Sequence, residues 1–238
     1  EKVDLWTAVR EAVTVPLVAG TGSYDTRHTA ELSRRAAATG VDGLLVVTPY
    51  YNRPSQAGIE AHFRSVGEAT DLPFLIYDIP IRAGRKVDTD VLVRLHREVP
   101  TMVGIKDAAG DPAGSARLVA DAGDGFDLYS GDDAFTLPFL AIGGTGVIGV
   151  TAHWSAAEQA EMIAAHAKGD VDAARRINAR LLDSYDFQTW GGAPQAVTTK
   201  ALLRTLGLAV GSTRPPIGPD PDGVDDAARA VLAGLGRS

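Results

Sequence analysis

The chain has 238 residues, of which 45% are apolar and 22% are charged, and its formal charge is −7 at neutral pH. These values are typical of a globular protein with a large core, and an acidic chain without a Lys/Arg cluster argues against nucleic acid or an anionic membrane as a partner. The absence of Cys excludes disulfides and thiolate chemistry and favours the cytoplasm. No apolar run approaches the ~18 residues of a membrane span.

Short apolar runs alternate with helical segments along the first two thirds of the chain. A helix is expected at the start, and the runs typical of buried strands lie at 15–19, 43–48, 74–79, 102–106, 127–130 and 146–151. Segments of helical periodicity lie between them, at 26–39, 56–69, 89–97, 112–122 and 135–142. A strand–helix repeat of roughly 30 residues predicts an α/β fold with a parallel sheet and a functional edge at the strand ends.

The repeat stops after residue 151. Only helices are expected beyond it, at 155–168, 171–187, 193–206 and 225–235. We take the first of these as the closing helix of an α/β barrel. The predicted organisation is therefore a barrel portion over residues 1–168 and a C-terminal helical extension over residues 169–238.

Lys106 ends the expected strand 102–106, and strand alternation places Gly104 on the same face. A glycine there would leave room beside an ammonium in apolar surroundings. Desolvation lowers the pKa of a lysine, and the neutral amine can attack a ketone to form a Schiff base. The competing interpretation is a strand-end lysine that reaches water.

Two further side chains suit the same chemistry. Tyr77 ends another expected strand, where a phenol can shuttle a proton, although a core tyrosine with a satisfied hydroxyl is the commoner case. Arg82 follows in an expected loop, where its guanidinium can hold a carboxylate through two parallel hydrogen bonds or simply face solvent.

The remaining motifs have ordinary explanations. Tyr50 and Tyr51 could enter a site or an interface, or cover the rim of the sheet. Asp132 and Asp133 precede a helix, so N-capping is favoured over a divalent metal. Residues 144–149 match G-x-G-x-x-G, but the motif follows a helix and leads into a strand, which is the wrong order for dinucleotide binding.

Six segments together resemble the dihydrodipicolinate synthase family, a branch of the pyruvate-dependent class I aldolases. They are Ala19-Gly20-Thr21-Gly22, Val47-Thr48-Pro49-Tyr50-Tyr51-Asn52, Tyr77-Asp78-Ile79-Pro80, Gly104-Ile105-Lys106-Asp107, Ser130-Gly131-Asp132-Asp133 and Gly146-Val147-Ile148. The resemblance implies a (β/α)8 TIM barrel with a C-terminal helical extension. Because only six strands are found, we expect the chain to lack the first two strands and the first helix of that barrel.

The resemblance also implies the chemistry. Lys106 would form the Schiff base with pyruvate, Tyr77 would relay protons, and Arg82 would hold a substrate carboxylate. Tyr51 would reach the site of a neighbouring subunit in a homotetramer, a dimer of dimers, and Ile148 would line the pyruvate pocket. The enamine would condense with aspartate semialdehyde on the route to lysine and diaminopimelate, with no metal or organic cofactor.

The sequence departs from the family at several positions. Ile81 and Gly149 stand where glycine and serine are usual, and a threonine segment of the site is not found. Tyr24 and His28 replace Asn and Glu of lysine-inhibited members, so we expect weak or no inhibition by lysine. The alternatives left open are an N-acetylneuraminate lyase or keto-deoxy sugar acid aldolase, a truncated non-catalytic barrel, and a metal-dependent aldolase using the paired aspartates.

Overall fold

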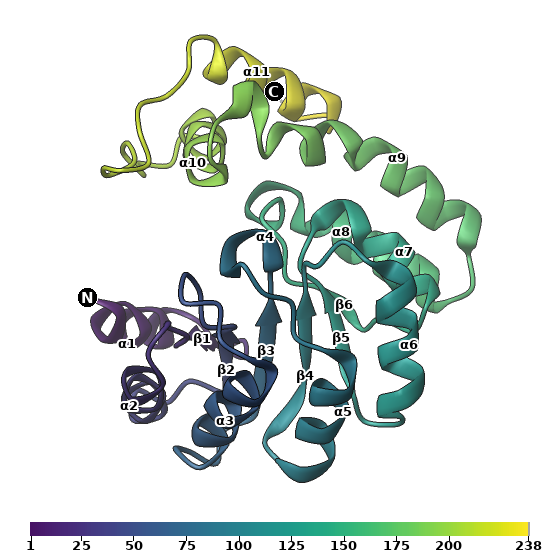
Figure 1. Cartoon of the computed structure of the whole chain (residues 1–238). Coiled ribbons are helices and arrows are strands. Elements are labelled where there is room, and N and C mark those ends of the chain that lie inside the picture. Colours follow the sequence, from purple (N-terminus) through teal and green to yellow (C-terminus); the bar gives the residue numbers. More distant parts are fainter. Residues whose placement is uncertain (238) are drawn as a thin grey trace. The chain divides into compact units, whose positions relative to one another are not determined.

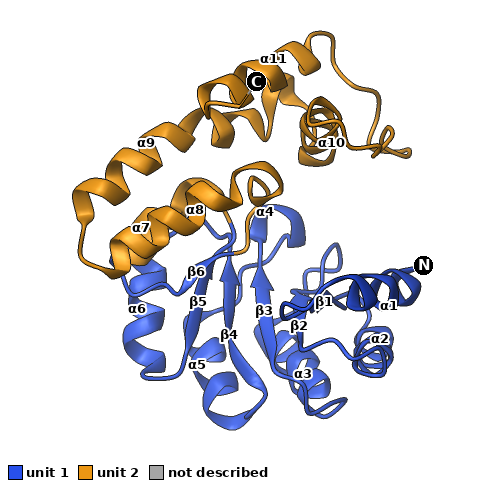
Figure 2. Ribbon diagram, turned by 180° about the vertical axis from the view of Figure 1, so that it is seen from behind, with its two compact units in different colours: residues 1–131, 141–147 blue, residues 132–140, 148–238 orange. Residues whose placement is uncertain are grey.

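The computed structural model describes residues 1–237, which fall into two compact units (Figure 2). The first unit contains residues 1–131 and 141–147, and the second contains residues 132–140 and the chain from residue 148 onward. This division follows contacts within the chain and not the strand–helix repeat. The boundary expected after residue 168 therefore stays a prediction.

The first unit is built on an open parallel sheet of six strands, a half-barrel in which each strand pairs with the next along the chain (Figure 1). The strands are β1 (Val18–Gly20), β2 (Gly43–Val47), β3 (Phe74–Asp78), β4 (Met102–Asp107), β5 (Asp127–Ser130) and β6 (Gly146–Val147). Sequential parallel pairing is the arrangement that strand–helix–strand units produce. The predicted α/β fold with a parallel sheet is confirmed.

One helix precedes the first strand of this unit, and the others connect its strands. They are α1 (Lys2–Ala12), α2 (Thr26–Ala37), α3 (Gln56–Gly67), α4 (Pro80–Ala83), α5 (Thr89–Glu98) and α6 (Pro112–Ala122). The side chains of Asp25, Ser55 and Asp111 accept backbone N–H bonds in the first turns of α2, α3 and α6. Such caps satisfy amides that have no partner within the helix, so the predicted starts of these helices are confirmed.

The two faces of the sheet differ in burial. One row of side chains is at most 1% exposed and consists of Leu44, Val46, Ile76, Ile105 and Leu128. The alternate row is half-buried and includes Leu45, Val47, Tyr77, Lys106 and Tyr129. Since successive residues of a strand point to opposite faces, the second row lies on one side of the sheet and the first on the other.

The first and last strands differ from the sequence prediction. β1 begins only at Val18, because the amide of Leu17 donates to the Asp42 carboxylate at 2.7 Å and not to a neighbouring strand. β6 ends at Val147 and does not run to residue 151, because the amides of Val150 and Thr151 donate to a carboxylate of Asp133. In both cases a side-chain carboxylate accepts the backbone amide that would otherwise bond to a neighbouring strand.

The two neighbouring aspartates of the second unit have different roles. Asp132 caps the short helix η1 (Asp133–Phe135), as predicted, by accepting the amide of Ala134 at 3.0 Å. Asp133 is 1% exposed and binds the amides of Val150 and Thr151 at 2.8 and 3.1 Å. It also accepts the Thr151 hydroxyl and the Gln159 amide, at 2.6 and 2.9 Å. N-capping alone therefore does not describe this pair.

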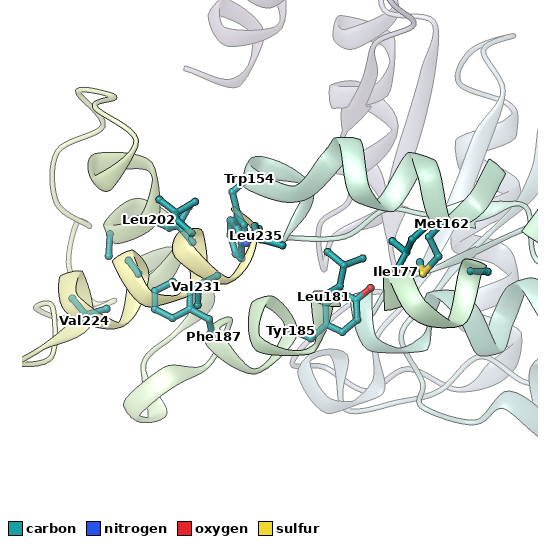
Figure 3. Close-up of a cluster of buried hydrophobic side chains, with 14 residues drawn as sticks. Trp154, Met162, Ile177, Leu181, Tyr185, Phe187, Leu202, Val224, Val231 and Leu235 are labelled. Atoms are coloured by element: carbon teal, nitrogen blue, oxygen red, sulfur yellow. The ribbon is translucent and has the colours of Figure 1, made fainter. Parts of the chain in front are cut away.

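The other regular elements of the second unit are helices. After η1 come α7 (Thr136–Ala141), α8 (Ala152–Ala167), α9 (Val171–Phe187), the short η2 (Trp190–Gly192), α10 (Gln195–Thr205) and α11 (Val224–Gly234). Buried apolar side chains from α8 to α11 form one cluster, which includes Trp154, Met162, Leu181, Phe187, Leu202 and Val231 (Figure 3). This cluster gives the helical region a core of its own, as expected for a separate compact unit.

Over residues 1–237, no helix combines the length and the apolar character that a membrane crossing requires.

Candidate active site

The carboxyl ends of three neighbouring strands place Tyr77, Lys106 and Tyr129 in one row. Tyr77 on β3 and Tyr129 on β5 are the register partners of Lys106 on β4. Register partners on adjacent strands project to the same face, so both phenol rings flank the lysine. The Lys106 Nζ atom lies 4.1 Å from the centroid of the Tyr77 ring. The structure thus brings together the two residues that the sequence analysis proposed for Schiff-base chemistry.

Gly104 serves a purpose other than the predicted one. A Cβ atom at this position would lie 2.0 Å from the backbone oxygen of Asp127 on β5. The glycine therefore permits the close approach of β4 and β5 and does not leave free room beside Lys106. The pairing of β3 with β4 has a β-bulge just before Gly104. Phe74 pairs with Met102 and Leu75 with Gly104, so Val103 has no register partner on β3.

A cavity of about 460 Å³ opens beside this row. It is lined by Lys2, Gly20, Gly22, Leu45, Val47, Tyr50, Tyr77, Ile79, Arg82 and Ala83. Six of the ten are apolar residues or glycines, and the Lys2 ammonium, two phenols and the Arg82 guanidinium are placed among them, as is usual for small-molecule sites. Tyr77 is the link between the cavity and Lys106, since it lines the first and contacts the second.

Arg82 reaches the cavity from a helical turn and not from the predicted loop. It lies in α4, whose C-cap Gly84 has a left-handed φ of 79° that a glycine adopts without strain. Ile81, in the same turn, is 90% exposed and has no positive φ. The side chain of Ile81, which stands where the family usually has glycine, therefore extends into solvent. Arg82 still lines the cavity.

The two tyrosines after β2 take different positions. Tyr50 lines the cavity and packs edge-on against Tyr24, with ring centroids 5.6 Å apart. Tyr51 is 92% exposed and has a φ of 72°, which is costly for a non-glycine residue. Tyr51 does not line the cavity of its own chain, so its predicted role at a neighbouring subunit stays a prediction.

Ile148, predicted to line the same pocket, is half-buried and is the first residue of the second unit after β6. It is not among the residues that line the cavity, and its role stays a prediction.

Tyr129 is a residue of the site that was not predicted from the sequence. It is half-buried, and burial followed by the charge of Asp127 raises the pKa of its phenol. A Cβ atom on Gly146, its register partner on β6, would lie 3.6 Å from the Tyr129 ring, which shows that the ring covers this glycine. Its place near the end of the expected strand 127–130 was the available signal, but the register with Lys106 is seen only in the structure.

A second cavity, of about 450 Å³, shares part of its lining with the first. It is formed by Lys2, Gly22, Ser23, Tyr24, Asp25, His28 and Tyr50. These residues include Tyr24 and His28, which differ from the side chains of lysine-inhibited members. The two cavities meet at Tyr50, Gly22 and Lys2.

The side chains in the described part of the chain, residues 1–237, contain no group of three or more His, Cys, Asp or Glu residues that could hold a metal ion. The paired aspartates considered for a metal-dependent aldolase are engaged elsewhere. Both carboxylate oxygens of Asp133 accept hydrogen bonds, from Val150 and Thr151 among others. This bonding disfavours the metal-dependent alternative.

Comparison with known proteins assigns the chain to a family. The profile of the dihydrodipicolinate synthetase family matches residues 1–233. The 4-hydroxy-tetrahydrodipicolinate synthase of Acidothermus cellulolyticus is 46% identical to the chain, over 91% of the chain and 70% of that protein.

Solved structures agree with this assignment. Dihydrodipicolinate synthase of Cyanidioschyzon merolae, with lysine bound, matches 99% of the chain and 80% of its own length, with a TM-score of 0.96 at 36% identity. The chloride-inhibited synthase of Acinetobacter baumannii, complexed with pyruvate, matches 100% of the chain and 83% of its own length, with a TM-score of 0.91 at 31% identity. The resemblance seen in the motifs is thereby confirmed, and the chain belongs to the dihydrodipicolinate synthetase family.

Proposed function

We propose that the protein is a 4-hydroxy-tetrahydrodipicolinate synthase, a lyase that condenses pyruvate with L-aspartate 4-semialdehyde through a Schiff base. The relatives named for this activity and the neighbour that holds pyruvate support the reaction. The observation that carries the proposal within the molecule is the contact of Lys106 with the Tyr77 ring at the edge of an apolar cavity.

The first step assigned to the site is attack of the neutral Lys106 amine on the keto carbon of pyruvate. This forms a carbinolamine, which loses water to give the protonated imine. The phenol of Tyr77, which lines the cavity beside Lys106, is placed to donate a proton to the departing hydroxyl and to take one back. Loss of a proton from the methyl group then gives an enamine, the carbon nucleophile. The iminium is itself the electron sink, so this route needs no cofactor.

The second substrate would approach through the same cavity. The enamine carbon attacks the aldehyde carbon of the semialdehyde, which restores the imine to Lys106. The amino group of the adduct then attacks the imine carbon, which closes the ring and releases Lys106 as the free amine. Arg82 is exposed at the cavity, where its guanidinium can bind the semialdehyde carboxylate through two parallel hydrogen bonds. Ile148 is assigned to the pyruvate pocket by its place in the family motif. Tyr129 would form a wall of the site on the side of Lys106 opposite Tyr77.

We further infer that the protein works as a homotetramer, a dimer of dimers, in the cytoplasm, with residues 1–168 as its (β/α) barrel portion and the residues from 169 onward as its helical extension. Tyr51 supports the assembly, because a tyrosine that is 92% exposed in a left-handed conformation is a costly feature for a surface without a partner.

Reductive trapping tests the proposed function. The protein is incubated with pyruvate and cyanoborohydride, and its peptides are analysed by mass spectrometry. A reduced pyruvyl group is expected on Lys106, and Lys106→Ala should abolish this adduct. The control is Lys168→Ala, at an exposed lysine that follows the last residue of α8, and it should retain the adduct. An unmodified Lys106 peptide in the wild-type protein would overturn the Schiff-base mechanism.

The acceptor is tested separately. Turnover of pyruvate with aspartate semialdehyde is compared with turnover with N-acetylmannosamine and with sugar-derived aldehydes. We expect the semialdehyde to be preferred, because the guanidinium of Arg82 can bind its carboxylate. Sugar aldehydes have no carboxylate for this contact. Preference for a sugar aldehyde would assign the chain to another aldolase of the superfamily.

A further inference from the structure

A pair of buried carboxyl groups lies directly behind the row of Tyr77 and Lys106. Asp78 on β3 and Asp107 on β4 follow these two residues and are themselves register partners. Because successive residues of a strand point to opposite faces, the two carboxyl groups point away from the cavity. They are 1% and 4% exposed. Two acidic side chains are thus held side by side out of contact with solvent.

Their hydrogen bonds are unequal. Asp107 accepts the amide of Ala109 at 2.8 Å through Oδ1 and the hydroxyl of Ser115 at 2.6 Å through Oδ2. Asp78 accepts only the amide of Val87, at 3.3 Å through Oδ2, and its Oδ1 atom has no partner among residues 1–237. Ionised Asp107 is therefore compensated on both oxygens, whereas ionised Asp78 would leave a buried charge on an oxygen without a donor.

The charge of Asp107 acts in the same direction, and the charge of Lys86 opposes it. The charged groups that act on Asp78 are Asp107 across the strand pair and Lys86 in the segment before α5, which also pairs with Asp111 at 3.1 Å. Burial, followed by the charge of Asp107, raises the pKa of Asp78 to about 7, against the opposing effects of the Val87 amide and Lys86. Two like charges in adjacent buried positions are unfavourable, so one member of such a pair retains its proton.

We propose that Asp78 is a positioning residue that carries a proton in the working protein, so that it and Asp107 share a single negative charge behind Lys106. Ionisation of Asp78 would add a second negative charge to the strand ends, which favours the ammonium of Lys106 over the neutral amine that attacks pyruvate. The protonation of Asp78 is independent of the proposed function, and only its effect on Lys106 rests on that function.

Infrared difference spectroscopy tests the protonation itself. The full chain is titrated through neutral pH, and the carbonyl stretch of a protonated carboxylic acid is followed in the wild-type protein, in Asp78→Asn and in Asp124→Asn, a control at an exposed acid. The wild type and Asp124→Asn should lose a band near pH 7 that Asp78→Asn lacks at every pH. A wild-type protein without such a band, or a band that survives in Asp78→Asn, would overturn the proposal.

The effect on Lys106 is tested by the pH dependence of reductive trapping with pyruvate. Below about pH 7, where Asp78 carries its proton, Asp78→Asn should be trapped at the wild-type rate. Above it, where only the wild type ionises at this position, Asp78→Asn should be trapped faster than the wild type. Asp124→Asn should match the wild type. Identical profiles for Asp78→Asn and the wild type would refute the effect on Lys106. A wild-type protein that is not trapped at any pH would instead contradict the proposed function, while the infrared result still decides the state of Asp78.

Discussion

Lys106 and Tyr77 are register partners on β4 and β3, and the lysine Nζ atom lies 4.1 Å from the centre of the tyrosine ring. The ring face carries partial negative charge, so it attracts an ammonium while it excludes water from one side of the nitrogen. The same residue lines the cavity, and its ring carries a hydroxyl. Ring and hydroxyl therefore have separable effects on Lys106, which single substitutions can distinguish.

Tyr77→Phe removes the hydroxyl and keeps the ring. We expect kcat for the condensation to fall about 100-fold or more, because general acid–base steps contribute gains of that order. Trapping of pyruvate on Lys106 should still occur, only more slowly. Tyr24→Phe, at a tyrosine that is 57% exposed, is the matched control and should keep the wild-type rate. Wild-type kinetics for Tyr77→Phe would remove the phenol from the mechanism.

Arg82→Ala removes the guanidinium from the cavity. We expect KM for aspartate semialdehyde to rise about tenfold to 100-fold, since a hydrogen bond to a charged group contributes about 1.5–3 kcal/mol. Binding of pyruvate should change less, and Arg82→Lys should restore only part of the loss because its ammonium cannot form the paired bonds. Arg85→Ala, at an exposed arginine that does not line the cavity, is the control. Equal effects of the two alanine variants would contradict the assignment.

His62 should make the protein sensitive to acid. Its side chain is 2% exposed on α3, its Nδ1 atom bonds the hydroxyl of Thr26 at 2.9 Å, and burial lowers its pKa to about 4. The unfolded chain therefore binds a proton at a higher pH than the folded chain does, and stability is lost as pH falls below about 6.5. We expect the free energy of unfolding to drop by about 2 kcal/mol between pH 7 and pH 5 from this residue alone.

Urea denaturation at the two pH values measures this effect. His62→Gln should show a smaller loss between pH 7 and pH 5 than the wild type, whereas His28→Gln, at an exposed histidine, should behave like the wild type. Equal losses in the wild type and in His62→Gln would refute the role of His62.

Gly149→Ser should destabilise the protein. A Cβ atom at this position would lie 2.2 Å from Oδ1 of Asp133, a carboxylate already held by the amides of Val150 and Thr151. Overpacking of this kind costs about 1–3 kcal/mol, which thermal or urea denaturation will detect. Gly58→Ala is the control, because its new Cβ would meet only ordinary contacts at 3.5 Å.

L-Lysine should inhibit the condensation weakly or not at all. The second cavity presents Tyr24 and His28 in place of the side chains expected in lysine-inhibited members, and Tyr50 is the matching residue that remains. Initial rates at increasing lysine concentration measure the effect. A submillimolar inhibition constant would contradict this prediction and show that the cavity recognises lysine through its other residues.

The elements whose capping and periodicity agree could be predicted from sequence to within a few residues. The helices at 112–122 and 171–187 have the predicted bounds. The errors fall where a distant side chain replaces a backbone partner, as Asp133 does at the end of β6. Such a contact joins residues that are far apart in the chain, so no local pattern signals it.

The candidate site was predictable where it depends on strand alternation and less so elsewhere. Tyr77 and Lys106 share a face because each occupies the matching position of its strand. The role of Gly104 was misjudged, because the close approach of Asp127 depends on how two strands pack. Tyr129 was missed because its importance comes from register with Lys106, a relation between strands that the order of residues alone does not give.

The Asp133 carboxylate has a practical consequence for dissecting this protein. It binds Val150, Thr151 and Gln159, which follow a stretch, residues 141–147, that belongs to the other unit. A fragment begun at residue 148 would therefore discard the acceptor of these donors and leave several buried polar groups unsatisfied. A fragment designed to express the second unit by itself should begin at residue 132 and carry a short linker in place of residues 141–147.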